Sequence, residues 1–247
     1  MGKKVLIPIP SRDFDPTEVV TPWLRLRAAG YQPIFATPDG KRGYTDPLLL
    51  KGVLFGRLGA KKEIVESYHS QLGKDSSFLN PIVYETVSAA DYDGLLLPGG
   101  HAPGMKTYLE STALQKTVLE FWNSKKPIAA ICHGTIVLAR TIDPETGRSI
   151  IYNKTMTSLT KLLERTAYYL TAWARGSYYR TYPEYVQDEV SGTMRDRANY
   201  QTGPLPTKPF FVRDGKLLTA RWPGDADLFA DEFVKMLDEA RLFRVKS

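Results

Sequence analysis

The chain has 247 residues, of which 43% are hydrophobic, and its 33 basic and 27 acidic residues give a formal net charge of +6. A chain of this length can bury a full core, and we expect one α/β domain over 1–247 rather than two small domains. No basic cluster is longer than a Lys-Lys pair, which argues against nucleic-acid binding. A single cysteine excludes an internal disulfide, and neither a signal peptide nor a membrane-length apolar run is present, so we expect a cytoplasmic protein without membrane contacts.

Short apolar runs alternate with helical patterns in chain order. The predicted strands are 3–10, 32–38, 92–100 and 127–132, and the predicted helices between them include 17–30 and 111–126. Residues 209–222 predict a β-hairpin that turns at Asp214 and Gly215, and a helix follows over 225–243. This order indicates a mostly parallel sheet with helices on both faces. Residues 39–82 and 165–208 exceed ordinary connections, so we expect them to be insertions with helices of their own.

Cys132 stands where an apolar strand meets a helical pattern, in KPIAAICHGTIVLAR over 126–140. This order predicts a nucleophile elbow, which holds the side chain over the carboxyl edge of the sheet. The helix N-terminus favours a thiolate and His133 offers a base, so we expect a depressed pKa for Cys132. Gly134 is expected to let the backbone turn sharply without a Cβ clash. The alternative is a buried, inert cysteine at a strand end.

The motifs around Cys132 resemble the signature of the ThiJ/PfpI superfamily, relatives of the class I glutamine amidotransferases. They are AAICHG at 129–134, LLLPGGHAPG at 95–104, TEVVTPWLRLRAAG at 17–30 and GKLLTARWPGDADLFADEFVKML at 215–237. The resemblance spans residue 3 to about residue 240 and implies a flavodoxin-like sheet. The GGHAPG form and the adjacent Cys-His pair are most similar to the heat-shock chaperone and glyoxalase III branch.

This branch implies a catalytic triad of Cys132, His133 and Glu164. The family's first helix assigns to Glu18 the carboxylate that hydrogen-bonds the nucleophile. TSLTKLLE, which contains Glu164, departs from the commoner acidic-pair form, because Leu163 stands where a second acid or a glycine often sits. Two plainer interpretations stay open: Glu18 is a charge that favours a helix N-terminus, or Glu164 is a solvated helix carboxylate.

The glycine pair at 99–100 ends the strand that precedes the Cys-His strand. We expect the amides of Gly100 and His133 to form an oxyanion hole, although an ordinary strand-ending turn has the same sequence pattern. Gly99 and His101 are candidates for the pocket, and His101 fits equally a loop histidine that caps the next helix. His69 lies among polar residues and is expected at the surface. Three widely separated histidines predict no metal-ligand cluster, and we expect neither a metal nor another cofactor.

The second insertion is rich in tyrosine over 165–190 and contains Trp173. Such a segment packs a subsidiary core or a dimer face, and we expect a homodimer. If the segment folds over the elbow instead, Arg175, Arg180 and the phenols would form a polar, cationic wall suited to a small anionic or dicarbonyl substrate.

Two classes of function remain open. The first is a cysteine-dependent enzyme that acts on small reactive carbonyls, with glyoxalase III- or deglycase-like conversion of methylglyoxal to lactate in the absence of glutathione. A hydrolase of the amidase, protease or isonitrile-hydratase type would use the same nucleophile. The second class is a stress-response holdase chaperone or a redox sensor, in which the thiol is oxidised reversibly. Replacing Cys132 separates the classes, because a holdase would keep its activity and an enzyme would not.

Overall fold

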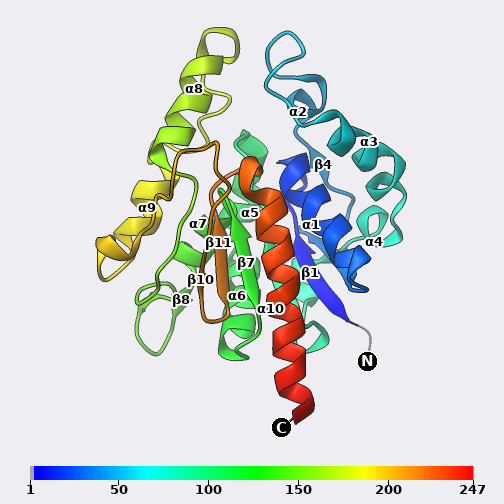
Figure 1. The fold of residues 1–247 in the computed structure, drawn as a ribbon, viewed down its shortest axis with the longest axis vertical. Coiled ribbons are helices and arrows are strands. Elements are labelled where there is room, and N and C mark those ends of the chain that lie inside the picture. Colours follow the sequence, from blue (N-terminus) through cyan, green and yellow to red (C-terminus); the bar gives the residue numbers. More distant parts are fainter. Residues whose placement is uncertain (1–2, 247) are drawn as a thin grey trace.

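The computed structural model describes residues 3–246, with side chains through residue 243. Within this range, seven strands form one sheet in the order β10-β11-β7-β6-β1-β3-β5, of which Figure 1 labels β10, β11, β7 and β1. Neighbouring strands are parallel except β10 and β11, which are antiparallel. The strands are β1 (Lys4–Pro8), β3 (Gln32–Thr37), β5 (Ile82–Val83), β6 (Gly94–Leu97), β7 (Ile128–Ile131), β10 (Phe211–Asp214) and β11 (Leu217–Ala220). The predicted flavodoxin-like, mostly parallel sheet is therefore confirmed.

Helices cover both faces of this sheet. On one face α1 (Pro16–Ala28) packs against α10 (Ala226–Lys246), and on the other α6 (Thr112–Asn123) packs against α7 (Gly134–Arg140) and the short α5 (Lys106–Leu109) lies beside α7 (Figure 1). Every residue of the central strands β6 and β7 is buried. Double coverage explains why these strands are continuous apolar runs rather than alternating patterns.

The predicted core elements are all present, with ends that differ by a few residues. One turn differs: Asp214 pairs with Leu217 in the last hairpin. The two turn residues are therefore Gly215 and Lys216, and Gly215 has a φ of +63°, which glycine adopts without strain. The prediction of one domain over 1–247 includes residues 1–2 and 247, which lie outside the described residues.

The first insertion contains helices, as predicted. It includes β4 (Tyr44–Thr45), α2 (Pro47–Lys51), α3 (Lys62–Ser70) and α4 (Ser76–Leu79), and it ends at β5, which joins the edge of the main sheet. The unpredicted strand β2 (Arg12–Phe14) pairs with β4. A second unpredicted pair, β8 (Ile142–Asp143) and β9 (Arg148–Ser149), forms a small antiparallel hairpin after α7.

The second insertion consists mainly of α8 (Lys161–Arg175) and α9 (Val186–Gly192). Both α8 and α2 lie beyond the carboxyl ends of the parallel strands, at the end of the molecule opposite the termini (Figure 1). The two insertions contact each other there: the Arg175 guanidinium donates to the Val53 carbonyl at 2.8 and 3.2 Å, and the Phe55 and Trp173 rings lie 6.2 Å apart. The aromatic insertion thus folds over the carboxyl edge of the sheet. No helix within residues 3–246 is long and apolar enough to cross a membrane.

Candidate active site

The predicted strand-to-helix elbow is formed by Cys132, between the end of β7 and the start of α7. Cys132 has a φ of +56°, a left-handed conformation that strains a residue with a side chain by roughly 1–3 kcal/mol. The strained backbone is held on both sides: the Cys132 amide donates to the Ala220 carbonyl at 3.1 Å, and the Thr135 hydroxyl donates to the Cys132 carbonyl at 2.7 Å. Such strain clusters at functional sites, where the surrounding structure enforces it.

The expectation that Gly134 avoids a Cβ clash is confirmed, but this residue does not make the sharp turn. The sharp turn is made by Cys132, and Gly134 has no positive φ. A Cβ at Gly134 would lie 2.3 Å from the Leu97 carbonyl oxygen and 2.7 Å from that of Pro98. Glycine is therefore required because α7 begins in direct contact with the last residue of β6 and with Pro98 after it.

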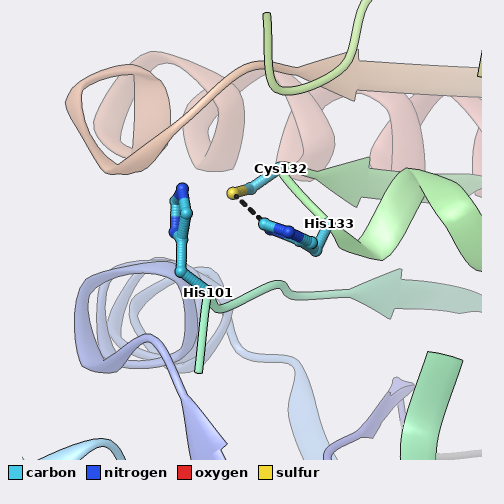
Figure 2. A group of neighbouring side chains, drawn as sticks. All are labelled: His101, Cys132 and His133. Carbon is cyan, nitrogen blue, oxygen red and sulfur yellow. Dashed lines mark hydrogen bonds between the residues drawn. The ribbon is translucent and has the colours of Figure 1, made fainter. Parts of the chain in front are cut away.

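Two histidines flank the thiol. The Cys132 Sγ lies 3.6 Å from His133 Nδ1, and the His101 and His133 rings are 4.7 Å apart at 70° (Figure 2). His101 comes from the loop after β6 and His133 from the elbow after β7, so the adjacent ends of two strands bring them together. The His101 Nε2 is buried and has no hydrogen-bond partner among the described residues.

The same three residues correct the expectation that no metal-ligand cluster exists. One ligand atom from each of His101, Cys132 and His133 lies within 4.8 Å of the others. Two imidazoles and a thiolate are a donor set suited to zinc. His101 and His133 are far apart in sequence, and only the pairing of β6 with β7 makes them neighbours. The absence of a required metal stays a prediction.

Burial controls the protonation of this cluster. It lowers the pKa of His101 to about 4, and burial together with His101 lowers the pKa of His133 well below its ordinary value. Burial also raises the pKa of Cys132 well above the free-thiol value, and the charges of Glu18 and Asp15 raise it further. The expected depressed thiol pKa is therefore wrong, because enclosure and nearby carboxylates outweigh the helix N-terminus. Near pH 7 the thiol and both imidazoles are neutral.

Glu18 lies beside the elbow, as the family resemblance implies. Its side chain is fully buried, and Oε2 accepts a hydrogen bond from the Gly99 amide at 2.8 Å. A Cβ at Gly99 would lie 2.9 Å from both Glu18 Oε2 and Cys132 Cβ, so the carboxyl and the cysteine side chain both pack against this glycine. Burial and the charge of Asp15 raise the pKa of Glu18 well above its usual range. The N-terminus of α1 is capped by Asp15 rather than Glu18, since Asp15 accepts from Thr17 and Glu18 amides.

The proposed oxyanion donors have amides that are free of backbone partners. In the part of the chain that the structure describes, neither Gly100 N nor His133 N donates a hydrogen bond to a backbone carbonyl. A Cβ at Gly100 would lie 2.5 Å from the Asp13 carbonyl oxygen, so this residue is confined by the segment before α1. Their function as an oxyanion hole stays a prediction.

Glu164 is buried in the first turn of α8, so it is not a solvated helix carboxylate. Its Oε2 accepts from the Val186 amide at 2.9 Å, at the start of α9, and its Oε1 lies 3.5 Å from Arg180 Nη1. Burial raises its pKa to about 7. Within residues 3–246 no hydrogen bond or ion pair joins Glu164 to Cys132 or His133. Its membership of the triad stays a prediction.

A cavity of about 390 Å³ lies next to His101, between the first insertion and α8. Its lining is mainly apolar and includes Leu49, Val53, Leu58, Leu163, Leu170 and Trp222. The expected cationic wall is absent from this cavity. Arg175 is hydrogen-bonded to Val53, whereas Arg180 pairs with Glu164 and stacks on Tyr185 at 3.7 Å. His69 is exposed, as predicted.

Sequence reasoning missed several polar residues around this site. Asp15 lines the cavity, and burial raises its pKa to about 6. Asp46 accepts a hydrogen bond from the buried Tyr179 hydroxyl at 2.8 Å, and Trp222 lines the cavity with a buried, unpartnered Nε1 among the described residues. The N-cap position of Asp15, directly before Pro16, was the available signal for one of them. The positions of the others follow from tertiary contacts.

Comparison with known proteins agrees with this geometry. Residues 9–204 match the family model described as ThiJ/PfpI family-like. The chain belongs to this family. It is 34% identical over 123 residues to Protein DJ-1 homolog D of Arabidopsis thaliana, a match that covers 49% of this chain and 28% of that protein.

Other relatives match over most of their length. The chain is 23% identical over 226 residues to the glutathione-independent glyoxalase hsp3101 of Schizosaccharomyces pombe, covering 91% of this chain and 87% of that protein. The crystal structure of glyoxalase III from Candida albicans superposes with a TM-score of 0.72 at 21% identity, covering 95% of this chain and 97% of that one. At this identity the structural likeness concerns the fold. The ThiJ/PfpI-like fold is thus shared with proteins named as glyoxalases.

Proposed function

We propose that this protein is a cysteine-dependent enzyme that converts methylglyoxal to lactate without glutathione, as its named glyoxalase relatives imply. The observation that carries the proposal is a thiol held in an elbow beside two neutral imidazoles and a buried carboxyl. A weakly acidic thiol requires an adjacent base to act as a nucleophile, and a neutral imidazole at hydrogen-bonding distance is such a base.

The first step forms a carbon–sulfur bond. Cys132 Sγ attacks the aldehyde carbon while its proton passes to His133 Nδ1, 3.6 Å away. The carbonyl oxygen becomes negative, accepts hydrogen bonds from the amides of Gly100 and His133, and then takes a proton to give a hemithioacetal. A protonated Glu18 stabilises negative charge on the sulfur.

The second step moves a proton between two carbons. A base removes the proton from the former aldehyde carbon, and the neighbouring ketone carbon receives one, so that a thioester forms. His101 suits this transfer, because it is neutral and one of its nitrogens lies within 4.8 Å of the sulfur. Water then cleaves the thioester to lactate and the free thiol. The sum is methylglyoxal plus water giving lactic acid, and it requires no external oxidant or reductant.

The test is an assay without glutathione that follows both methylglyoxal loss and lactate formation. Wild-type protein should produce lactate, while Cys132→Ala and His133→Ala should not. His69→Ala is the matched histidine control, since His69 is exposed on α3, and it should retain wild-type turnover. Wild-type inactivity toward methylglyoxal, with ammonia release from an amide or hydration of an isonitrile instead, would assign the same nucleophile to a hydrolase.

A holdase chaperone is the second candidate, and exposed apolar surface favours it. Phe55 is 89% and Trp173 69% exposed, and their rings lie near one another at the tip of the insertions. Suppression of client aggregation by both wild-type protein and Cys132→Ala, without turnover by either, would support this function.

A further inference from the structure

The cavity next to His101 is larger and more apolar than methylglyoxal requires. Its volume is about 390 Å³, whereas an apolar cavity of about 150 Å³ is enough to hold benzene. Methylglyoxal carries only one methyl group beyond its two carbonyls. Most of the cavity would therefore remain unfilled by that substrate.

Two separate segments make the apolar walls. One wall comes from the first insertion, with Leu49, Val53 and Leu58, and the other from α8, with Leu163, Ala167 and Leu170. The hydrogen bonds from Arg175 to the Val53 carbonyl join the two walls. An apolar cleft that the fold builds from two insertions, joined by the part-buried hydrogen bonds of Arg175, is suited to an apolar ligand group.

The cavity also adjoins the reacting atoms. His101 forms part of its lining, and the same imidazole has a nitrogen within 4.8 Å of Cys132 Sγ (Figure 2). Trp222 lines the cavity as well, and its Nε1 is buried without a partner among the described residues. A few polar groups at one end of an apolar pocket typically orient a ligand whose remaining part is apolar.

We infer that the substrates of this enzyme are 2-oxoaldehydes with a bulky apolar substituent, an aryl ring or an alkyl chain of several carbons, which occupies the cavity between the first insertion and α8. The inference rests on the proposed function, because it places the substituent in the cavity while the aldehyde carbon meets Cys132. The chemistry at the two carbons is unchanged, so the products are the corresponding 2-hydroxyacids.

The test compares kcat/KM across methylglyoxal, longer alkylglyoxals and phenylglyoxal. Each methylene group that leaves water for the cavity should raise kcat/KM by about 4-fold until the cavity is full. In Ala167→Phe the added ring fills the cavity, so the ratio of kcat/KM for phenylglyoxal to that for methylglyoxal should fall by at least about 10-fold. Ala174→Phe is the matched control, since Ala174 is exposed on the same helix and outside the lining; it should leave the ratio unchanged.

The outcomes separate this inference from the proposed function. A flat or falling series in the wild-type protein, together with methylglyoxal turnover, overturns the inference and leaves the glyoxalase function intact; this result needs no variant to fold. If no dicarbonyl is turned over, acetophenone supplies the second measurement, because it carries the aryl ring without an aldehyde. Saturation transfer from wild-type protein to acetophenone, lost in Ala167→Phe, would keep the cavity assignment while the glyoxalase function fails. No saturation transfer in either protein overturns the cavity assignment together with the glyoxalase function.

Discussion

The elbow around Cys132 differs in burial from the insertion layer, which is formed by residues 39–82 and 165–208. The two regions meet at His101. Around the elbow every residue from Gly94 to Gly100 and from Pro127 to Ala139 is buried, and glycines 99, 100 and 134 sit where any side chain would collide. The insertion layer instead exposes large apolar side chains such as Phe55 and Trp173. The enclosed region therefore fixes the positions of Cys132 and His133, and the more open region forms the walls of the cavity.

Two buried glutamates, Glu18 beside the elbow and Glu164 in the insertion layer, differ in the same way. Glu18 and Glu164 are both enclosed, and burial raises the pKa of each. Glu18 binds the Gly99 amide next to Cys132, whereas Glu164 binds the Val186 amide and joins α8 to α9. Substitutions near the elbow should therefore change the rate of the reaction, and substitutions in the insertion layer should change stability or selectivity.

The largest expected effect is on turnover when the elbow pair is broken. Cys132→Ala and His133→Ala should each lower kcat by about 10³-fold or more, and the double variant should be no slower than the worse single one, because the two residues act as a unit. Steady-state kinetics on methylglyoxal measures this. Losses that multiply in the double variant would show that the two residues act independently.

The next largest effect is expected for Glu18→Gln. The amide keeps an acceptor for the Gly99 amide but carries no acidic proton, so kcat should fall by roughly 10²-fold with little change in Tm. Glu63→Gln is the control, because Glu63 is an exposed glutamate on α3.

The pH dependence of thiol alkylation tests the electrostatic effect of Glu18 on Cys132. The wild-type midpoint should lie above the free-thiol value of about 8.5, and it should shift in Glu18→Gln. An upward shift means that a protonated Glu18 donates to the thiolate, and a downward shift means that Glu18 is charged when the thiol ionises. Unchanged kinetics and an unchanged midpoint would reduce Glu18 to a packing residue.

A smaller effect, on stability, is expected for Gly134→Ala. The new methyl group would lie 2.3 Å from the Leu97 carbonyl, and overpacking of this kind lowers the free energy of unfolding by roughly 1–3 kcal/mol. Gly192→Ala in α9 is the matched control. Its new Cβ would have only the end of the Arg197 side chain nearby, at 3.9 Å, and we expect no loss of stability. Denaturant unfolding of both variants measures the difference, and equal stabilities would mean that the contact at Leu97 relaxes freely.

The smallest effect is the pH dependence of stability from Glu164. Its folded pKa is raised to about 7 from an ordinary 4.5, so the folded state holds this proton more tightly than the unfolded state does. The resulting stability is fully present below pH 4.5 and is lost as the pH rises through 7. Glu164→Gln should flatten this slope, by on the order of 1–3 kcal/mol between the two limits. Tm measured against pH tests it. The kcat of this variant tests the predicted triad: a loss as large as that of His133→Ala would place Glu164 in it, and a change of less than about 10-fold would leave Glu164 as a contact between α8 and α9.

Much of the core follows from local sequence patterns. Apolar runs and helical spacing are sufficient for β1, β3, β6, β7 and the helices between them, because strands covered on both faces must be apolar throughout. The elbow was also predicted, because the helical pattern that becomes α7 directly follows the apolar run that becomes β7. The assignment of Glu18 depended on a family resemblance, because no local pattern links it to Cys132. The structure places the Glu18 carboxyl beside this predicted nucleophile.

By itself the sequence determined the order of elements, the parallel sheet and the residue at the elbow, because these depend on periodicity over neighbouring residues. Tertiary structure alone decided the protonation of the site and the character of the cavity. The pKa of Cys132 is raised by enclosure and by carboxylates from α1 and the residue that caps it. The cavity wall is apolar because Arg175 is hydrogen-bonded to the Val53 carbonyl and Arg180 is paired with Glu164, so neither guanidinium lines the cavity. Burial and charge interactions depend on distances between segments far apart in the chain, and no local pattern records those distances.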